Sequence, residues 1–418
     1  MILHVGRRWA AVVVIVGSLL AACGQDGDRA RRSSPPAQSP RLEGEGPPCR
    51  YVYDIPYHNI RTTCIEFVYD GIARPEAAPE IMGLAFGADG VLYMARTARG
   101  EVWAMRDEDG DQFMDDPFRV AGDLDLPVAL AVYDGSLYVS SVGGLLRLDD
   151  EDGDGLFERR TVLVDDLSAP TGYWPGSVAV GPDGRLYVTL GADCVTCEPG
   201  SIPQPGRLMS YALDGTDARV EATGLNYPAD FAWHPETGDL WIVDRALPAA
   251  EIGQAGPPDE LNRWAAGAEY GFPACVGDRQ PDPRFGGDEA ACRATEPPRL
   301  TFPHQSSPSG VAFYPFDAFP FWKGALITVL NGSWNRIEPA GYALVAVGFT
   351  DGQPDGTLSQ IAPAGPRGET ISIPEYSLAD KGFYPFHPVD VVVSDEGWLY
   401  LSLQEGRILR LRPRPPEE

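Results

Sequence analysis

Basic residues are scarce in this 418-residue chain, which holds 33 Lys and Arg against 60 Asp and Glu and carries a formal net charge of −27. Binding to nucleic-acid phosphates depends on protein cations, so this balance argues against nucleic acid as a partner. It also argues against peripheral binding to an anionic lipid surface. The charge instead indicates a soluble, self-repelling surface.

Long apolar runs are nearly absent, and beyond the N-terminal region none is long enough to span a membrane. The one pronounced run, Trp9 to Leu20, follows Arg7 and Arg8 and is typical of a secretory signal. It is too short for a comfortable transmembrane helix. The mature chain is therefore expected to be anchored to a membrane at most, not to span it.

The end of this run, Leu-Ala-Ala-Cys at 20–23, resembles a bacterial lipobox. The resemblance implies a signal peptide over 1–22, cleavage before Cys23 and a diacylglyceryl anchor on its sulfur; the alternative is an ordinary signal with a chance cysteine. Residues 23–48 are rich in Arg, Ser, Pro and Gly, which predicts a tether. Gly24 follows the cysteine, and by resemblance to sorted lipoproteins this favours the outer membrane, facing the periplasm.

Cysteine is also rare, with seven in the chain. Once Cys23 is set aside the remaining count is even, which in an exported chain predicts disulfides. Proximity suggests the pairs Cys49–Cys64, Cys194–Cys197 and Cys275–Cys292, although six cysteines allow fifteen pairings. The second pair could instead be redox-active or half of a zinc site. No second CxxC or histidine pair completes a zinc site, so a structural disulfide that stabilises a loop is favoured.

What the sequence repeats is one hairpin, seen in GSVAVGPDGRLYVTLG at 176–191. Alternating apolar residues flank an Asp-Gly turn, the pattern of paired antiparallel strands. Related stretches begin at Met82, Val128, Ala229, Ser309 and Val389. Their turn glycines, 45, 49, 54, 86 and 73 residues apart, are Gly90, Gly135, Gly184, Gly238, Gly324 and Gly397.

These intervals predict one all-β domain over 49–418, a six-bladed β-propeller of four-stranded antiparallel blades. The first intervals fit one blade each, and the last two fit a blade plus a long insertion. An open sandwich is the alternative, but sandwiches rarely repeat one sequence pattern. Strands near Thr63–Tyr69 and Arg407–Leu411 are expected to pair and close the ring, because closure removes exposed edges.

Two acidic loops lie between predicted strands. Alternating oxygen ligands around a tight turn are typical of calcium loops, although both loops lack the bidentate glutamate of the full motif. Solvated acidic turns are the alternative. The candidate ligands are Asp107, Asp109, Asp111 and Asp115 in the first loop and Asp150, Asp152, Asp154 and Glu158 in the second. Either way, these loops are expected to be structural rather than catalytic.

From about Thr62 to Pro413 the chain resembles the glucose/sorbosone dehydrogenase family, and within it the sorbosone-type branch. The motifs that carry the resemblance occur in order: GPDGRLYVTLGADCVTC (181–197), PPDELN (257–262), GAEYGFPACVG (267–277), HQSSPSG (304–310), NGSWNR (331–336) and HPVDV (387–391). The resemblance implies a soluble quinoprotein that oxidises sugars with pyrroloquinoline quinone (PQQ) and calcium.

The chain departs from the family at four positions. The family's catalytic histidine is here Tyr173, and a phenol is a poor base at neutral pH. The family's Arg-Asn-Pro, which grips the cofactor's carboxylates, has Asn226 in place of the arginine. Its Asp-Asn-Gly near the calcium is here Asp244-Arg245-Ala246, and the arginine of its Arg-Pro-Val-Asp is here His387. These changes predict weak cofactor binding and little glucose oxidation.

The candidate catalytic groups are Tyr173, His304 and His387, and either histidine could instead be structural. The candidate cofactor-binding residues are Asn226, Asp230, Asp244, Arg336 and Asp390. The favoured hypothesis is a dehydrogenase that oxidises a sugar or other alcohol and passes electrons to a periplasmic acceptor.

The nearly equal alternative is a catalytically degenerate propeller that binds a glycan or protein partner. A metal-dependent lactonase-like hydrolase ranks last. It would need converging carboxylate and amide ligands, and the chain has five Asn and no obvious ligand set.

Overall fold

A computed structural model describes Cys49 and residues 63–71, 80–165, 167, 172–201, 203–248, 256–333, 336–337, 339–362, 371–372, 383 and 386–414. These residues all belong to one compact unit, Gly44–Glu418. The predicted signal peptide, Cys23 and tether lie outside the described residues. Within the described part, no helix has the length and apolarity to cross a membrane.

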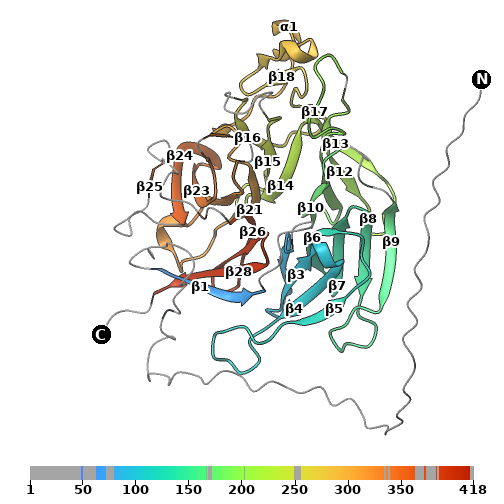
Figure 1. Cartoon of the computed structure of the whole chain (residues 1–418), viewed down its shortest axis with the longest axis vertical. Helices are drawn as coiled ribbons and strands as arrows, with labels where there is room; N and C mark the ends of the chain where they lie inside the picture. Colours follow the sequence, from blue (N-terminus) through green and yellow to red (C-terminus); the bar gives the residue numbers. More distant parts are fainter. Residues whose placement is uncertain are drawn as a thin grey trace, which may run out of the picture. The chain divides into compact units, whose positions relative to one another are not determined.

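The described chain forms six antiparallel blades of four strands each, as predicted (Figure 1). In the first three blades, from inner to outer strand, these are β2 (Leu84–Phe86), β3 (Leu92–Arg96), β4 (Glu101–Met105) and β5 (Phe118–Ala121); β6 (Pro127–Tyr133), β7 (Ser136–Ser141), β8 (Gly144–Asp149) and β9 (Arg159–Asp165); β10 (Pro175–Val180), β11 (Leu186–Leu190), β12 (Gly206–Tyr211) and β13 (Arg219–Leu225). The last three are β14 (Tyr227–Trp233), β15 (Leu240–Arg245), β16 (Asp259–Arg263) and β20 (Leu300–Phe302); β21 (Pro308–Phe313), β22 (Leu326–Leu330), β23 (Ala343–Thr350) and β24 (Gln353–Ala362); β26 (Pro388–Val393), β27 (Leu399–Leu403), β28 (Arg407–Pro413) and β1 (Thr63–Asp70).

The inner strands form a closed ring, because each contacts the next and β26 contacts β2. Each inner strand turns into the second strand of its blade at one of the predicted glycines. All six turn glycines have positive φ values, between 73° and 84°. Glycine adopts this left-handed conformation without steric cost, so the repeated glycine marks the same turn in every blade.

Strands from both ends of the chain close the ring in the sixth blade, which confirms the predicted closure. β1 pairs antiparallel with β28, with Glu66 opposite Arg410 and Cys64 opposite Arg412 (Figure 1). The buried carboxylate of Glu66 accepts hydrogen bonds from Arg410 Nη2 at 2.7 Å and from Arg412 Nε at 2.9 Å. A charged, fully paired contact therefore joins the first strand to the last.

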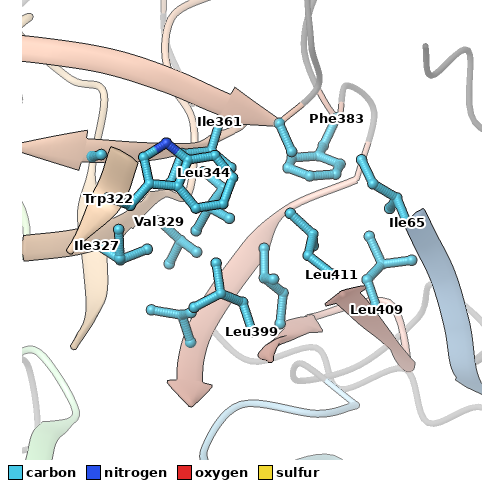
Figure 2. Close-up of a cluster of buried hydrophobic side chains, with 14 of the residues drawn as sticks. Ile65, Trp322, Ile327, Val329, Leu344, Ile361, Phe383, Leu399, Leu409 and Leu411 are labelled. Atoms are coloured by element: carbon cyan, nitrogen blue, oxygen red, sulfur yellow. The ribbon is translucent and has the colours of Figure 1, made fainter. Parts of the chain in front are cut away.

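Apolar side chains pack between neighbouring blades. Figure 2 shows the cluster shared by the fifth and sixth blades, to which the closing strand β1 contributes Ile65. Its labelled members also include Trp322, Ile327, Val329, Leu344, Ile361, Phe383, Leu399, Leu409 and Leu411. Since each blade buries its faces against its two neighbours, the core is a set of clusters around the ring.

The long interval between Gly238 and Gly324 contains an insertion between β16 and β20, as predicted. It holds β17 (Ala268–Glu269), which pairs with β13, the hairpin of β18 (Cys275–Val276) and β19 (Gln280–Pro281), and the short helix α1 (Glu289–Cys292). The Cys275–Cys292 disulfide crosses it. The Cys49–Cys64 and Cys194–Cys197 disulfides are also present, so all three predicted pairs are confirmed.

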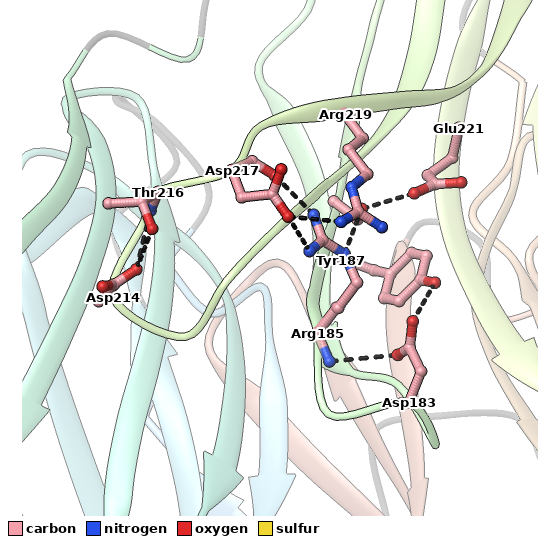
Figure 3. A network of polar contacts seen from close by, with 9 residues as sticks. Asp183, Arg185, Tyr187, Asp214, Thr216, Asp217, Arg219 and Glu221 are labelled. Atoms are coloured by element: carbon pink, nitrogen blue, oxygen red, sulfur yellow. Dashed lines mark hydrogen bonds and ion pairs between the residues drawn. The ribbon is translucent and has the colours of Figure 1, made fainter.

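Charged side chains of the third blade pair with one another near the surface. Arg185, just before β11, donates to Ser210 Oγ at 2.9 Å. It also donates to Asp217 at 2.8 Å, and Arg219 donates to the same carboxylate (Figure 3). Such exposed pairs contribute little to stability. They leave the buried polar groups near the ring axis as the candidates for function.

Candidate functional site

The predicted catalytic residues gather at one end of the ring. Every inner strand begins at this end, and every second strand finishes there, because the inner hairpins turn at the other end. Tyr173, Asn226, His304 and His387 each precede an inner strand, and Asp244 lies near the end of a second strand. We call this the site end and the opposite one the turn end.

A cavity of about 360 Å³ runs along the inner strands. Tyr227 and Arg245 line it toward the site end, and residues as far along as Tyr133 and Val392 line it toward the turn end. Most of its wall is glycine, alanine, valine and leucine. Its acidic lining residues are Asp230 and Asp390. These two predicted cofactor-binding residues therefore line the cavity at the centre of the ring, which we call the hub cavity.

Asp230 and Asp390 occupy equivalent positions in the fourth and sixth blades, each two residues after a proline at a β-bulge. Asp230 accepts hydrogen bonds from Val311 N at 2.7 Å and Phe231 N at 2.8 Å. Asp390 accepts from Leu84 N at 2.7 Å and from its own neighbour. Each carboxylate thus ties its inner strand to that of the following blade.

These hub carboxylates share one environment. Burial raises the pKa of Asp390 to about 6, and burial together with the charge of Asp390 raises the pKa of Asp230 to about 8. Between them passes Gly310, where a Cβ would lie 2.5 Å from Asp390 Cα and from its Oδ1. The pair holds protons more tightly than ordinary aspartates, because loss of hydration disfavours both carboxylates and the charge of Asp390 opposes ionisation of Asp230.

Tyr173 forms an aromatic wall at the site end. Its ring stacks on Tyr227, with centroids 4.5 Å apart and an interplanar angle of 8°. Burial raises the pKa of Tyr173 to about 12. A phenol with this pKa is a poor acceptor of a proton at neutral pH, so the geometry supports stacking rather than base catalysis at this position.

A buried polar cluster surrounds Asn226 and Asp244. The Asn226 amide donates to Arg245 O at 2.6 Å, and its backbone N–H donates to Asp244 Oδ2 at 3.0 Å. Asp244 lies directly opposite Glu260 across β15 and β16. Burial, and then the charge of Glu260, raises the pKa of Asp244 well above its usual range, and burial raises the pKa of Glu260 to about 7.

Three oxygens of this cluster are buried without a hydrogen-bond partner: Asn226 Oδ1, Asp244 Oδ1 and Asn262 Oδ1. An all-oxygen donor set with two carboxylates is the kind that calcium prefers. Glu260 and Asn262 are absent from the candidates drawn from the sequence. The sequence feature that could have identified them is the polar pattern Asp-Glu-Leu-Asn, which lies inside a strand that buries most of its residues.

The two histidines have different surroundings. His387 Nδ1 lies 2.7 Å from Glu405 Oε1, and the same carboxylate accepts the backbone N–H of His387. His304 Nδ1 instead lies 3.3 Å from Arg336 Nη1, and burial together with that guanidinium lowers the pKa of His304. A carboxylate that orients an imidazole favours its use as a proton acceptor, whereas a neighbouring cation opposes it.

Arg245 is the basic residue that lines the hub cavity. Its guanidinium lies over the Tyr227 ring, 5.1 Å from the centroid, and its Nε donates to Pro308 O at 2.9 Å. No ion pair joins it to a carboxylate within the described part of the chain. The sequence noted this arginine as a departure from the family motif but did not place it at a site.

The predicted calcium ligands lie at the turn end, on the β4–β5 and β8–β9 connections. Ligand oxygens within 4.8 Å of one another come from Asp150, Asp152, Asp154 and Glu158 in one loop and from Asp107, Asp109 and Asp115 in the other. Asp111 does not belong to the second group; its carboxylate accepts the Phe113 N–H instead. Both loops are separated from the site end by the length of the blades.

The Cys194–Cys197 loop lies at the site end, after β11. The Tyr173 hydroxyl is 3.5 Å from Val195 O, and Tyr173 and Cys197 pack together against the cluster of Ala192, Leu247 and Phe272. The disulfide therefore supports the loop beside the Tyr173 wall.

Comparisons with known proteins agree with this architecture. The family model described as Glucose / Sorbosone dehydrogenase matches residues 145–333, and the Strictosidine synthase-like, N-terminal model matches residues 385–411. An uncharacterised protein of Borreliella burgdorferi is 28% identical over 144 residues, 34% of this chain. That match spans 37% of the relative's length.

Similar solved structures are dehydrogenases and carbohydrate-active enzymes. The holo PQQ domain of pyranose dehydrogenase from Coprinopsis cinerea has a TM-score of 0.68 at 16% identity, over 86% of this chain and 97% of that one. The calcium structure of a family AA12 enzyme from Trichoderma reesei gives 0.67 at 20%, over 87% and 98%. A putative oxidoreductase (glucose dehydrogenase) of Thermus thermophilus gives 0.55 at 23%, over 84% and 99%. At these identities the likeness establishes the six-bladed propeller fold.

Proposed function

We propose that this protein is a quinone-dependent dehydrogenase that oxidises a hydroxyl of a sugar or another alcohol at the site end, with PQQ and calcium as cofactors. The observation that carries the proposal is the His387–Glu405 pair, with its 2.7 Å contact at the mouth of a ring whose sequence matches a sugar dehydrogenase family model over 145–333. The fold of PQQ-containing enzymes supports it.

The residues at the site end fit these cofactors. Calcium is suited by the unpartnered oxygens of Asn226, Asp244 and Asn262 beside Glu260. A planar, carboxylate-bearing quinone is suited by the Tyr173–Tyr227 wall and by the guanidinium of Arg245, which forms no ion pair within the described residues. When bound, the quinone would supply a two-electron acceptor for hydride from the substrate carbon.

His387 acts as the base in this proposal. Glu405 accepts the Nδ1 proton and holds the ring, so Nε2 is the nitrogen that accepts the hydroxyl proton of the substrate. The half-buried contact with Glu405 also stabilises the imidazolium that forms. His304 serves a different role, because burial and then the Arg336 guanidinium beside it lower its pKa.

The two acidic loops bind calcium as structural elements at the turn end. Their clustered carboxylate oxygens support this assignment. The chain is held at the outer membrane by a lipid on Cys23, faces the periplasm and passes its electrons to an acceptor there; the lipobox-like sequence supports this placement.

A degenerate propeller that binds a glycan or a protein is the second candidate. Tyr173 favours it, because the residue at the family's base position has a pKa of about 12 and is packed as a wall. The two functions differ in whether the purified protein takes up the quinone.

The test is a titration of the purified protein with PQQ and Ca²⁺, followed by absorbance, and then a panel of sugars and alcohols with an artificial electron acceptor. We expect uptake of the quinone and oxidation of at least one substrate. His387→Ala should abolish turnover and leave quinone uptake unchanged. His234→Ala is the matched control, because His234 lies at the turn end and accepts backbone N–H groups there. Absence of quinone uptake by the unmodified protein would refute the proposal.

A further inference from the structure

Arg245 stands out because its guanidinium is held in place without a carboxylate partner among the residues that the structure describes. Its Nε donates to Pro308 O in the next blade, and its plane lies over Tyr227, which is itself stacked on Tyr173. Tyr227 is buried, so the stack has a fixed position. The guanidinium is therefore preorganised at the site end of the hub cavity, which it lines.

The carboxylates near Arg245 are engaged elsewhere. Asp259, whose pKa Arg245 helps to lower against the effect of burial, accepts Ala246 N with Oδ1. Its Oδ2 accepts Ser306 Oγ and Ser307 N. Within the described part of the chain no carboxylate pairs with the terminal nitrogens of Arg245. A partly buried guanidinium that lacks a carboxylate partner among these described residues is stabilised by a ligand that supplies the anion.

Positions 226 and 245 lie side by side across β14 and β15. Tyr227 and Arg245 are register partners, and the Asn226 amide donates to Arg245 O at 2.6 Å. The family motifs that the sequence resembles have arginine at the first position and asparagine at the second, the reverse of this chain. Compared with those motifs, this chain has its arginine on the other strand of the β14–β15 pair.

We propose that Arg245 is the anion-binding residue of this site and holds a carboxylate of a planar organic anion against the Tyr227–Tyr173 wall. The guanidinium fork suits a carboxylate because it can donate two parallel hydrogen bonds. Under the proposed function the anion is the quinone cofactor, and to that extent the inference rests on it. The chemistry of recognition itself needs only a flat polycarboxylate.

The experiment measures binding rather than turnover. The full chain is titrated with PQQ in the presence of Ca²⁺, and separately with benzene-1,3,5-tricarboxylate, by calorimetry at two NaCl concentrations. The variants are Arg245→Gln, Arg245→Lys and the exchange Asn226→Arg with Arg245→Asn. Arg263→Gln is the control, because that arginine lies on the adjacent strand β16 and pairs with Asp239 toward the turn end.

Loss of a charged hydrogen-bonding group costs about 10- to 100-fold in affinity, so we expect Arg245→Gln to weaken binding by that factor. Arg245→Lys should bind between the two, and the exchange variant should regain most of the loss of tricarboxylate binding, which does not depend on Asn226 as a calcium ligand. Arg263→Gln should bind as the unmodified protein does. Thermal melting of each variant shows whether it is folded, and the lysine and exchange variants test the idea if Arg245→Gln is not.

The outcomes separate the two proposals. If the protein binds PQQ and Arg245→Gln binds it equally well, the role of Arg245 is refuted and the dehydrogenase proposal stands. If the protein binds the tricarboxylate through Arg245 but not PQQ, the anion site stands and the quinone function fails. Binding of neither probe overturns both.

Discussion

Replacement of Glu66 by glutamine tests whether the buried ion pair in the closing blade holds the ring together. Glu66 is fully buried, and its carboxylate pairs with Arg410 and Arg412, whose side chains are also buried. Glutamine keeps the shape but removes the charge. Arg410 and Arg412 would then lose the carboxylate that pairs with both of them between β1 and β28.

Breaking a buried ion pair from one side costs about 3–5 kcal/mol, because the remaining charge is left unpaired. For a domain of this size each kcal/mol lowers the melting temperature by roughly 2 °C, so Glu66→Gln should melt about 6–10 °C below the unmodified protein. Glu289→Gln is the control. Its ion pair with Arg293 is exposed, so its loss should cost less than about 1 kcal/mol.

The pH dependence gives a second measurement of the same effect. Burial alone would raise the pKa of Glu66, but hydrogen bonds and charges from Arg412 and Arg410 outweigh it and hold the pKa below 4.5. A lowered folded-state pKa means that the contribution is present above the unfolded value and disappears as the pH falls through the folded one. The gap between the two proteins should therefore narrow below about pH 4.5. A gap no larger than that of Glu289→Gln at pH 7 would refute the reasoning.

Three further outcomes follow from described contacts. Because the folded-state pKa of Asp230 is raised to about 8, the folded protein binds this proton more tightly than the unfolded chain does. The unmodified protein should therefore lose stability as the pH rises from about 4 to 8. Over that range the melting temperature of Asp230→Asn should rise relative to that of the unmodified protein. Asp152→Asn should reduce the rise in melting temperature on Ca²⁺ addition, compared with EDTA. Removal of the 275–292 disulfide, which spans 17 residues, should cost about 3 kcal/mol in denaturant unfolding, against about 1.6 kcal/mol for the 194–197 pair, which spans 3.

The fold could be predicted because its signals are local and repeated. A turn glycine specifies one hairpin, and six similar hairpins cannot bury their faces except against one another. Even the closing pair of strands followed from this reasoning, since an open ring would expose two edges. The disulfide pairs were predictable for a related reason: each joins cysteines no more than 17 residues apart.

The site was predicted less completely, because it depends on contacts between distant segments. Asp230 and Asp390 were predicted to bind the cofactor, but a β-bulge lies beside each of them and each carboxylate accepts a hydrogen bond from the backbone of the next blade. The orienting contact of Glu405 with His387 spans 18 residues and two strands, which no local pattern reveals. In the sequence Arg245 stood out only as a departure from the family motif. Its proposed role depends on the stacked rings of Tyr227 and Tyr173, which fix the position of its guanidinium.

The six inner strands have the same backbone arrangement. The residue type at one equivalent position changes from blade to blade, and the change separates the blades with candidate functional groups from those without. In blade order, that position holds Gly83, Ala129, Ser177, Asp230, Gly310 and Asp390. The first two blades present only small apolar groups there, and their distinctive residues are the acidic loops at the turn end. The third to sixth blades supply the aromatic wall, the orphaned oxygens, Arg245 and the His387–Glu405 pair at the site end. A ring built by repetition gains a site only where the repeats diverge, so under the proposed function these four blades are the part of the propeller to which substrate and cofactors bind.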